Sequence, residues 1–322
     1  MEKMIEKELS TSPKVQVGQK IIAWFKLIRV PNLFTLPGDI AFGVITAGGT
    51  MLSMVYLKAA LILLGLYIFG LITNDIMDIN IDKLERPERP LPSGLIHILT
   101  AKIVAMLILA AVLYGAYSMN HNFKITVIFL ALLILMYNFY LKKHPILGPI
   151  TVSACRVGGL VLGFYTVFPQ VDSNILMLYL GSWVWFMYFL SVSLSAYYET
   201  DCEKSVKGVL LLFVVPLIWL SSAPLVSGSF TVVSIMKELN LSLIVALVSG
   251  LIFAVHILKN VIILTYFVKE GEDISRSIGD LIWNLIFLQV SACAFLGAPD
   301  AAFLILLLAV PGKLLAKKFY IS

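Results

Sequence analysis

The sequence predicts an all-α protein, a polytopic membrane helical bundle, on the basis of three observations. Of its 322 residues, 60% are hydrophobic and only 13% are charged. Its mean hydropathy is +0.95, and a soluble domain of this length could not bury so much apolar surface. Apolar runs close to the twenty or so residues that cross a bilayer recur along the whole chain. Lipid is therefore the expected solvent for most of the molecule.

Ten apolar runs are expected to be membrane-spanning helices, and the last of them is the shortest. No low-complexity linker or change of composition separates them, so we predict a single transmembrane domain over residues 31–322. The ten runs are residues 34–52, 57–74, 98–118, 124–141, 148–167, 175–197, 208–226, 241–267, 279–297 and 301–316.

Residues 1–30 form a polar, Lys-rich N-terminal segment. It lacks the apolar core of a secretory signal, so no cleavable signal peptide is expected. Residues 21–28 are predicted to form an amphipathic helix that lies in the membrane interface and leads into the first span.

The basic residues indicate the orientation of the chain. With a cytoplasmic N-terminus, the ten runs place eighteen of the 24 lysines and arginines in inside segments, three outside and three within spans. This bias fits the positive-inside rule. It predicts that residues 74–94 lie on the cytoplasmic side. The net charge of +5 then reflects the basic residues of the cytoplasmic loops, and no nucleic-acid partner is expected.

The cysteines and histidines indicate no metal or disulfide framework. Cys155, Cys202 and Cys293 are scattered and form no CxxC pair, and the four histidines lie on different segments. Neither a zinc site nor a set of disulfides is predicted.

The most informative segment is residues 74–94, NDIMDINIDKLERPERPLPSG, at the end of the second apolar run. On a helix, Asp75, Asp78 and Asp82 fall within about 60° of one another. Each acid buried at the bilayer centre would cost about 2.5–3.5 kcal/mol, so these carboxylates should line a wet cavity near the interface. Mg²⁺ suits that setting, because it takes one or two carboxylates together with phosphate oxygens and keeps several waters.

Arg156 lies about eight residues into the fifth apolar run. A buried structural pair with a distant acid is one reading of this residue, and snorkelling to the interface is another. A charged residue inside the membrane usually marks the path of a ligand, so we predict that Arg156 faces the cavity and binds a carboxylate or phosphate of an acceptor. Gly158, Gly159 and Gly163 nearby permit close helix packing.

The pattern N-D-x-x-D-x-x-x-D followed by R-P-x-R-P-L-P-S-G resembles the first aspartate-rich motif of the UbiA superfamily of intramembrane prenyltransferases. The resemblance extends to Arg29-Val-Pro-Asn32 before the first span and to Tyr137 with Lys142 and Lys143 after the fourth. It covers nearly the whole chain. The stretch at 147–163 resembles the UbiA-like members found in Ebo gene clusters.

This resemblance implies a bundle of nine to ten transmembrane helices around a central cavity, with Mg²⁺ bridging a prenyl diphosphate between two acidic motifs. It implies that Asp75, Asp78 and Asp82 bind Mg²⁺. Lys142 and Arg86 would bind phosphate oxygens. Arg89 would either bind phosphate as well or only hold its own loop in place. The other residues that it places against substrate are Asn32, Asn74, Tyr137 and Lys143.

The second acidic motif departs from the family pattern. Its candidates are Glu199, Asp201 and Glu203, followed by Lys204. Matching Y-x-x-x-D-x-E favours Asp201 with Glu203 as metal ligands and would need an irregular helix end. A regular helix would instead present Glu199 with Glu203 on one face. A second full metal site and a substitution of Lys204 for a cation both stay open.

The expected function is Mg²⁺-dependent transfer of a polyprenyl group from its diphosphate to a small acceptor within the membrane. One alternative is a terpene cyclase or diphosphate lyase of the same family that uses no external acceptor. Another is a catalytically weakened carrier or scaffold for isoprenoid lipids.

Overall fold

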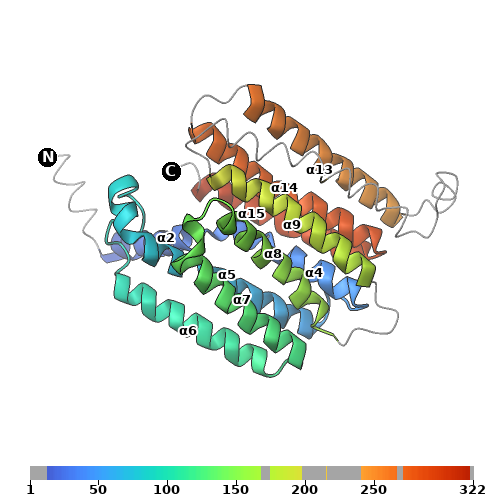
Figure 1. Ribbon diagram of the computed structural model, residues 1–322, viewed down its shortest axis with the longest axis horizontal. Helices are drawn as coiled ribbons and strands as arrows, with labels where there is room; N and C mark the ends of the chain where they lie inside the picture. The colour runs from blue at the N-terminus through green and yellow to red at the C-terminus, as the bar shows by residue number, and fades with distance from the viewer. Residues whose placement is uncertain (1–12, 168–174, 198–214, 216–240, 267–270, 320–322) are drawn as a thin grey trace.

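The computed structural model describes residues 13–167, 175–197, 215, 241–266 and 271–319, and it is all-helical over those residues (Figure 1). The helices in chain order are α2 (Pro13–Leu27), α3 (Val30–Leu33), α4 (Leu36–Thr46), α5 (Met54–Glu85), α6 (Ile98–Tyr117), α7 (His121–Phe139), the 3₁₀ turn η1 (Leu141–Lys143), α8 (Leu147–Phe164), α9 (Ile175–Tyr197), α13 (Leu241–Tyr266), α14 (Gly271–Phe295) and α15 (Pro299–Phe319). The prediction of an all-α membrane bundle is confirmed.

Seven helices within the described residues are long and apolar enough to cross a membrane, namely α5, α6, α7, α8, α9, α13 and α14. Their bounds agree with the predicted runs to within a few residues, with two exceptions. Helix α5 continues beyond its predicted run to Glu85, and α14 begins before its predicted run, at Gly271. The predicted run 208–226 lies outside the described residues. The run 301–316 falls inside α15, which contains Pro311 and is not among the seven.

The first predicted span, 34–52, is wrong in its length. The helix α4 has only 11 residues and ends at Thr46. Gly48 follows with a φ of 84°, and the Gly49 N–H donates back to the Val44 carbonyl at 2.8 Å. A left-handed glycine closing a helix in this way is a common C-terminal stop, and the apolar pattern alone did not reveal it.

Helix α5 is the longest element, with 32 residues. The Ser53 side chain caps its start by accepting from the Tyr56 N–H. The helix then continues without a break through the acidic residues and ends before Arg86 and Pro87, where the proline prevents a further turn. The three aspartates therefore stand on one continuous helix, as the sequence predicted.

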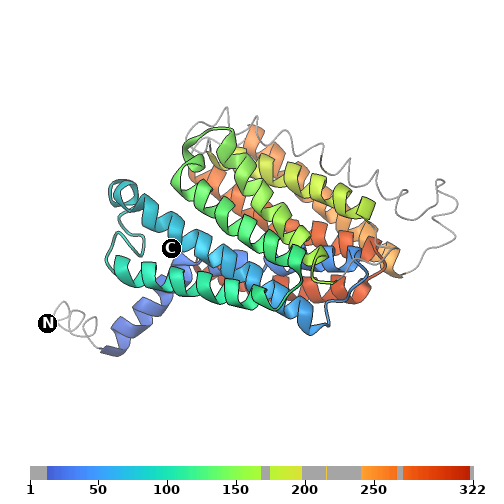
Figure 2. The same cartoon turned by 60° about the horizontal axis from the view of Figure 1, so that its bottom comes forward.

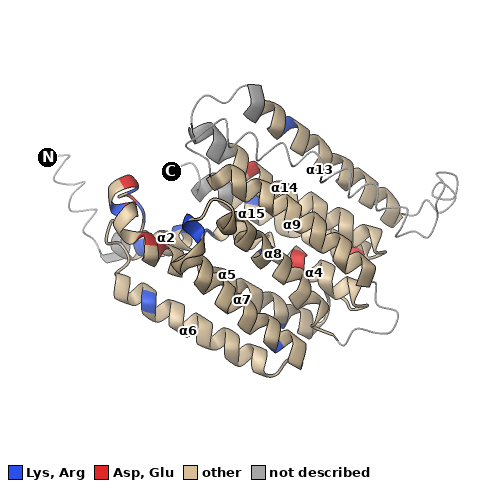
Figure 3. Ribbon diagram, viewed as in Figure 1, with Lys and Arg blue, Asp and Glu red and all other residues tan. Residues whose placement is uncertain are grey.

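The core of the bundle is formed where α4 packs against α8, and α8 against α9, while α14 contacts α4, α9 and α13. Helices α5, α6 and α7 form a second group beside α8 (Figures 1 and 2). Helix α2 projects away from the bundle at one end (Figure 2) and exposes Val17, Ile21 and Phe25. Charged residues gather along the chain at that same end, near the C-terminal end of α5 (Figure 3).

The close contact between α4 and α8 depends on Gly163. A Cβ atom at this position would lie 2.2 Å from the Ile40 carbonyl oxygen, which is backbone and cannot move aside. The predicted role of this glycine in helix packing is therefore confirmed.

We expect Gly163→Ala to destabilise the protein by about 1–3 kcal/mol, the usual cost of overpacking a well-packed core. Thermal unfolding in detergent measures this. Gly279→Ala is the control, because a Cβ atom there meets nothing within 4 Å. Equal unfolding temperatures for the two variants would contradict the assigned contact.

Candidate active site

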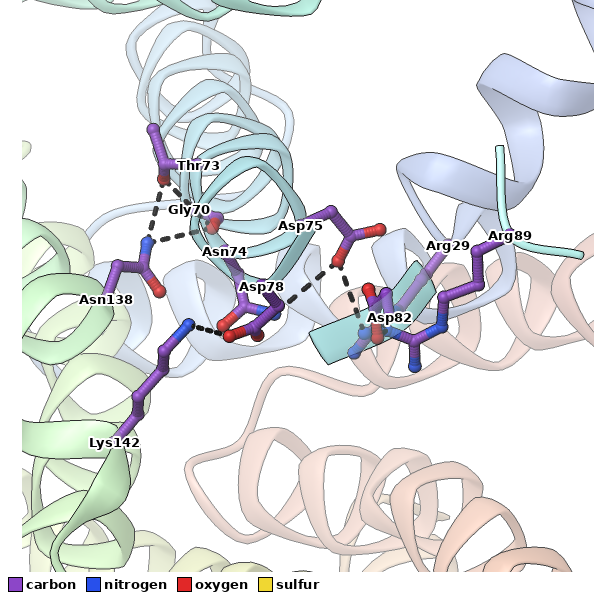
Figure 4. A network of polar contacts seen from close by, with 10 residues as sticks. All are labelled: Arg29, Gly70, Thr73, Asn74, Asp75, Asp78, Asp82, Arg89, Asn138 and Lys142. Carbon is purple, nitrogen blue, oxygen red and sulfur yellow. Dashed lines mark hydrogen bonds and ion pairs between the residues drawn. The ribbon is translucent and has the colours of Figure 1, made fainter. Parts of the chain in front are cut away.

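The acidic face of α5 is the first component of the site (Figure 4). Asp75 and Asp82 are buried, and Asp78 is partly exposed between them. All three project from the same face of the helix, because they are spaced by three and four residues.

Each of these carboxylates has a basic partner from a different part of the chain. Lys142, in the turn η1 after α7, contacts Asp78 at 2.5 Å. Arg89, in the loop after α5, bonds both oxygens of Asp82 through one nitrogen at 2.8 Å. Asp75 is faced by a third cation, Arg29, at 3.9 Å. In Figure 4 the pair of Lys142 and Asp78 lies apart from the other two pairs, whereas Arg29 and Arg89 lie close together beside Asp82. The charges of both arginines act on Asp75.

Arg29 is held in an unusual backbone conformation. It lies between α2 and α3 with φ 47° and ψ 54°, the left-handed region, and it is the one described non-glycine residue with a positive φ. Such a conformation costs of order 1–3 kcal/mol and persists where the surrounding structure imposes it. Here it turns the chain so that the Arg29 side chain reaches Asp75.

Two asparagines complete the polar end of the site. Asn74 Nδ2 donates to Asp75 at 3.5 Å, a long contact. Asn138 Nδ2 donates to the Gly70 carbonyl at 3.1 Å and to Thr73 Oγ1 at 2.8 Å, which ties α7 to α5. The sequence prediction missed Asn138, although it directly follows Tyr137 and lies in the apolar stretch of α7 after Thr126.

A cavity adjoins the acidic face and has two compartments with shared walls. The first has a volume of about 260 Å³ and lies among α4, α5, α7 and α8. The second has a volume of about 390 Å³ and lies among η1, α8, α9 and α14. The residues common to both are Arg29, Tyr67, Tyr137, Val152 and Arg156.

The two compartments differ in chemistry. Leucine and isoleucine side chains, including Leu63, Leu66 and Leu130, line much of the first, and Asn74 and Asn138 lie at its polar end. The second adds Lys142 to the cations Arg29 and Arg156, which line both compartments.

Five predicted site residues line the cavity, namely Asn32, Asn74, Tyr137, Lys142 and Arg156. Asp75, Asp78, Asp82 and Arg89 line neither compartment, and Asp75 and Asp78 are linked to the cavity through Arg29 and Lys142.

Arg156 is both a cavity residue and half of a buried ion pair. Its guanidinium lies 3.0 Å from Asp39 Oδ2, and Asp39 is fully buried. Asp39 Oδ1 accepts from Trp185 Nε1 at 2.8 Å and from Gln289 Nε2 at 2.7 Å. The ring of Phe189 lies 4.4 Å from the guanidinium carbon. Four helices, α4, α8, α9 and α14, are joined by these contacts.

Sequence reasoning named Arg156 but not its partner. A signal was present, since Asp39 is an acid inside an apolar run and intramembrane charges tend to pair with one another. Gln289 gave a weaker signal of the same kind, as one of two amides, with Asn284, in the apolar run of α14.

Two further predicted residues lie away from the cavity. Arg86 is exposed at the end of α5, and Lys143 is exposed in η1; neither lines a described compartment. Asp201, Glu203, Glu199 and Lys204 lie outside the described residues.

The donor set on α5 fits Mg²⁺ in kind. Within the described part of the chain, no three His, Cys, Asp or Glu side chains form a group that could hold a metal ion alone. Mg²⁺ needs no such cage, because it takes one or two carboxylates and completes its shell with water and phosphate oxygens. Asp75 and Asp78, one turn apart with flexible cations beside them, can provide those carboxylates once Arg29 and Lys142 turn to a phosphate.

Comparison with known families identifies one match. The model described as the UbiA prenyltransferase family matches residues 35–268. Among curated relatives, the digeranylgeranylglyceryl phosphate synthase of Sulfurisphaera tokodaii is 27% identical over 188 residues, which is 58% of this chain and 63% of that protein. The synthase of Methanococcus aeolicus is 35% identical over 137 residues, which is 42% of this chain and 48% of that protein. The chain thus spans less than two thirds of the length of these relatives.

Solved structures share the fold. A UbiA homologue from Aeropyrum pernix K1 superposes with a TM-score of 0.58 at 14% identity and covers 86% of this chain and 96% of its own. A structure of a digeranylgeranylglyceryl phosphate synthase in membranes gives a TM-score of 0.56 at 20% identity, covering 87% and 99%. A UbiA homologue from Archaeoglobus fulgidus bound to DMAPP and Mg²⁺ gives 0.51 at 15% identity, covering 87% and 98%.

The ion pair between Arg89 and Asp82 should hold the loop that follows α5. We expect Arg89→Ala and Asp82→Ala to lower the unfolding temperature by similar amounts and the double variant to add little, giving a coupling energy of about 0.5–3 kcal/mol. Unfolding in detergent measures this cycle. Arg86→Ala is the matched control, since it is exposed in the same loop. Additive effects in the cycle would show that the pair contributes nothing.

Proposed function

The chain belongs to the UbiA prenyltransferase family, and from that premise we propose that it transfers a polyprenyl group from a prenyl diphosphate to a small acceptor inside the membrane, with Mg²⁺ as cofactor. One observation carries the proposal: Arg29 and Lys142, which pair with Asp75 and Asp78 of the acidic face, line a cavity that also has an apolar compartment. A diphosphate with an isoprenoid tail combines these two chemistries in one molecule.

The carboxylates and cations would change partners when the donor binds. Asp75 and Asp78 would hold Mg²⁺, whose positive charge would lower the barrier by stabilising the charge that grows on the departing diphosphate. Arg29 and Lys142, which now neutralise these carboxylates, would turn to the phosphate oxygens. Such preorganised charges act most strongly in a site that excludes water.

The apolar compartment suits the isoprenoid tail. Leu63, Leu66, Leu130 and Ile134 line it, and it extends along α5 from Asn74 to Leu63, about 16 Å at 1.5 Å per residue. The second compartment would receive the acceptor, and the walls common to both would bring the acceptor to the first carbon of the tail. Holding the two reactants together in this way removes much of the entropic cost of their encounter.

The protein is an integral, multi-pass membrane protein, and we further propose that its acidic face and its N-terminus lie on the cytoplasmic side. The support is the distribution of lysine and arginine along the chain, which favours that orientation under the positive-inside rule.

A carrier for isoprenoid lipids is the second candidate, and the pairing of every carboxylate on the acidic face with a cation favours it.

The products of an assay separate the candidate functions. Purified protein with geranylgeranyl diphosphate, Mg²⁺ and native lipid extract should release diphosphate and form a larger lipid. Release with a free hydrocarbon or alcohol would identify a cyclase or lyase, and binding without release would identify the carrier.

Asp78→Asn tests the metal role. We expect turnover to fall about 10²–10³-fold, the usual loss when one group that stabilises developing charge is removed. Diphosphate release measures turnover, and an unchanged unfolding temperature shows that the variant is folded. Asp280→Asn is the control, because Asp280 is an exposed acid on α14 and does not belong to the acidic face of α5. A wild-type rate for Asp78→Asn would refute the proposed role.

Lys142→Gln and Lys143→Gln form a second, matched pair. Lys142 lines the cavity and contacts Asp78, whereas Lys143 is exposed. We expect Lys142→Gln to weaken binding of geranylgeranyl diphosphate by about tenfold or more, as for a lost charge-assisted contact, and Lys143→Gln to have a much smaller effect. Equal losses in a donor-binding assay would mean that both lysines reach the diphosphate.

A further inference from the structure

The buried pair of Asp39 and Arg156 has hydrogen-bonding capacity that the protein does not use. Asp39 Oδ2 faces the guanidinium at 3.0 Å but has no hydrogen bond of suitable geometry, and Arg156 Nε also lacks a partner among the described residues. Asp39 is 0% exposed and Arg156 is 9% exposed. An unsatisfied buried polar atom costs about 1–3 kcal/mol, and more when it is charged, so these two atoms call for an explanation.

A purely structural role does not account for them. The frame is already provided by the other atoms of the network, since Asp39 Oδ1 accepts from Trp185 and Gln289 and the Arg156 terminal nitrogens reach Thr35 at 3.3 and 3.4 Å. A well-packed apolar pair would also join these helices at lower cost, because replacing a buried ion pair by hydrophobic residues is often neutral or stabilising.

The pair faces the cavity. Asp39 lines the first compartment, and Arg156 lines both compartments. Asp39 lies beside Gly159 and near Leu63, at the end of the apolar compartment that is farthest from Asn74. A group bound at Arg156 therefore lies against a wall that both compartments share.

The net charge of the pair decides which ligand group it favours. Arg156 alone would attract a carboxylate or phosphate, as the sequence suggested. With the Asp39 carboxylate 3.0 Å from the guanidinium, an anion placed there meets attraction from one partner and repulsion of similar size from the other. An uncharged group that can both donate and accept a hydrogen bond satisfies both partners.

We propose that Asp39 and Arg156 form a subsite that binds an uncharged hydroxyl group of the acceptor, with the hydroxyl donating to Asp39 Oδ2 and accepting from Arg156. This rests on the proposed transfer function. Phe189, Val192 and Ile282 line the second compartment beside Arg156, so the hydroxyl is carried on an apolar body. Asp39 and Arg156 are thus residues that determine acceptor specificity.

The test compares two acceptor probes, a monoalkylglycerol and the corresponding monoalkylglyceryl phosphate, whose phosphate carries a charge of about −1.5 to −2 at pH 7. Affinities are measured with the full chain in nanodiscs of uncharged lipid, without donor or Mg²⁺. The wild type should prefer the uncharged probe. Asp39→Asn should shift the ratio of affinities by about tenfold or more toward the phosphate, because the Arg156 charge is then no longer balanced.

Two controls accompany this variant. Asp39→Asn/Arg156→Gln restores zero net charge and should return the ratio close to its wild-type value. Asp280→Asn, an exposed charge on α14, should not change it. A ratio for Asp39→Asn equal to that of the wild type would overturn the proposal, as would a wild-type protein that binds neither probe.

A measurement on the wild type keeps the test decisive if Asp39→Asn does not fold. Methylating both hydroxyls of the monoalkylglycerol removes its donors and keeps its acceptor oxygens. This probe should bind about tenfold or more weakly, because the Asp39 carboxylate would then face an oxygen that cannot donate. Equal affinity for the two uncharged probes would overturn the proposal.

Failure of the subsite can be distinguished from failure of the transfer function. Mg²⁺-dependent binding of geranylgeranyl diphosphate is measured in the wild type and should be lost in Asp78→Asn. A wild type without Mg²⁺-dependent donor binding would refute the transfer function, whereas an unchanged probe ratio in a donor-binding protein refutes only the subsite.

Discussion

A carboxylate among membrane helices is costly unless it is paired, and the described residues contain four pairs of a carboxylate with a cation. Asp75, Asp78 and Asp82 on α5 bind partners from three separate segments, and Asp39 on α4 binds Arg156 on α8. Each pair joins pieces of chain that are distant in sequence. The positions of the turn before α3, of η1 and of the loop after α5 therefore follow from the acids that their basic residues neutralise.

These pairs divide into two kinds. The three at the end of α5 lie near solvent, and two of their cations, Arg29 and Lys142, are long side chains that can reach either a carboxylate or a phosphate. The pair of Asp39 and Arg156 is enclosed by Trp185, Gln289 and Phe189. The first kind can exchange partners when a ligand arrives, and the second is fixed. One cavity is thus bounded by cations that can change partners, Arg29 and Lys142, and by a fixed ion pair, Asp39 with Arg156.

The sequence predicted the part of the site that depends on a local pattern. The spacing of Asp75, Asp78 and Asp82 needs only the helical period, and Lys142 and Arg29 belong to recognisable motifs. The partnership of Asp39 with Arg156 depends on how α4 packs against α8, and no local pattern carries that information. The same is true of the end of α4 at Gly48, since hydropathy reports apolar composition and not the backbone conformation that ends a helix.

The length of α5 has a consequence for how the two products of the proposed reaction would leave. Its 32 residues extend about 48 Å, whereas the hydrocarbon layer is about 30 Å thick. Roughly the last twelve residues, which carry the three aspartates, therefore extend into the headgroup zone. Inorganic diphosphate released there can diffuse straight into water, while the prenylated lipid can move sideways into the bilayer. The two products would depart by separate routes, and neither would have to wait for the other.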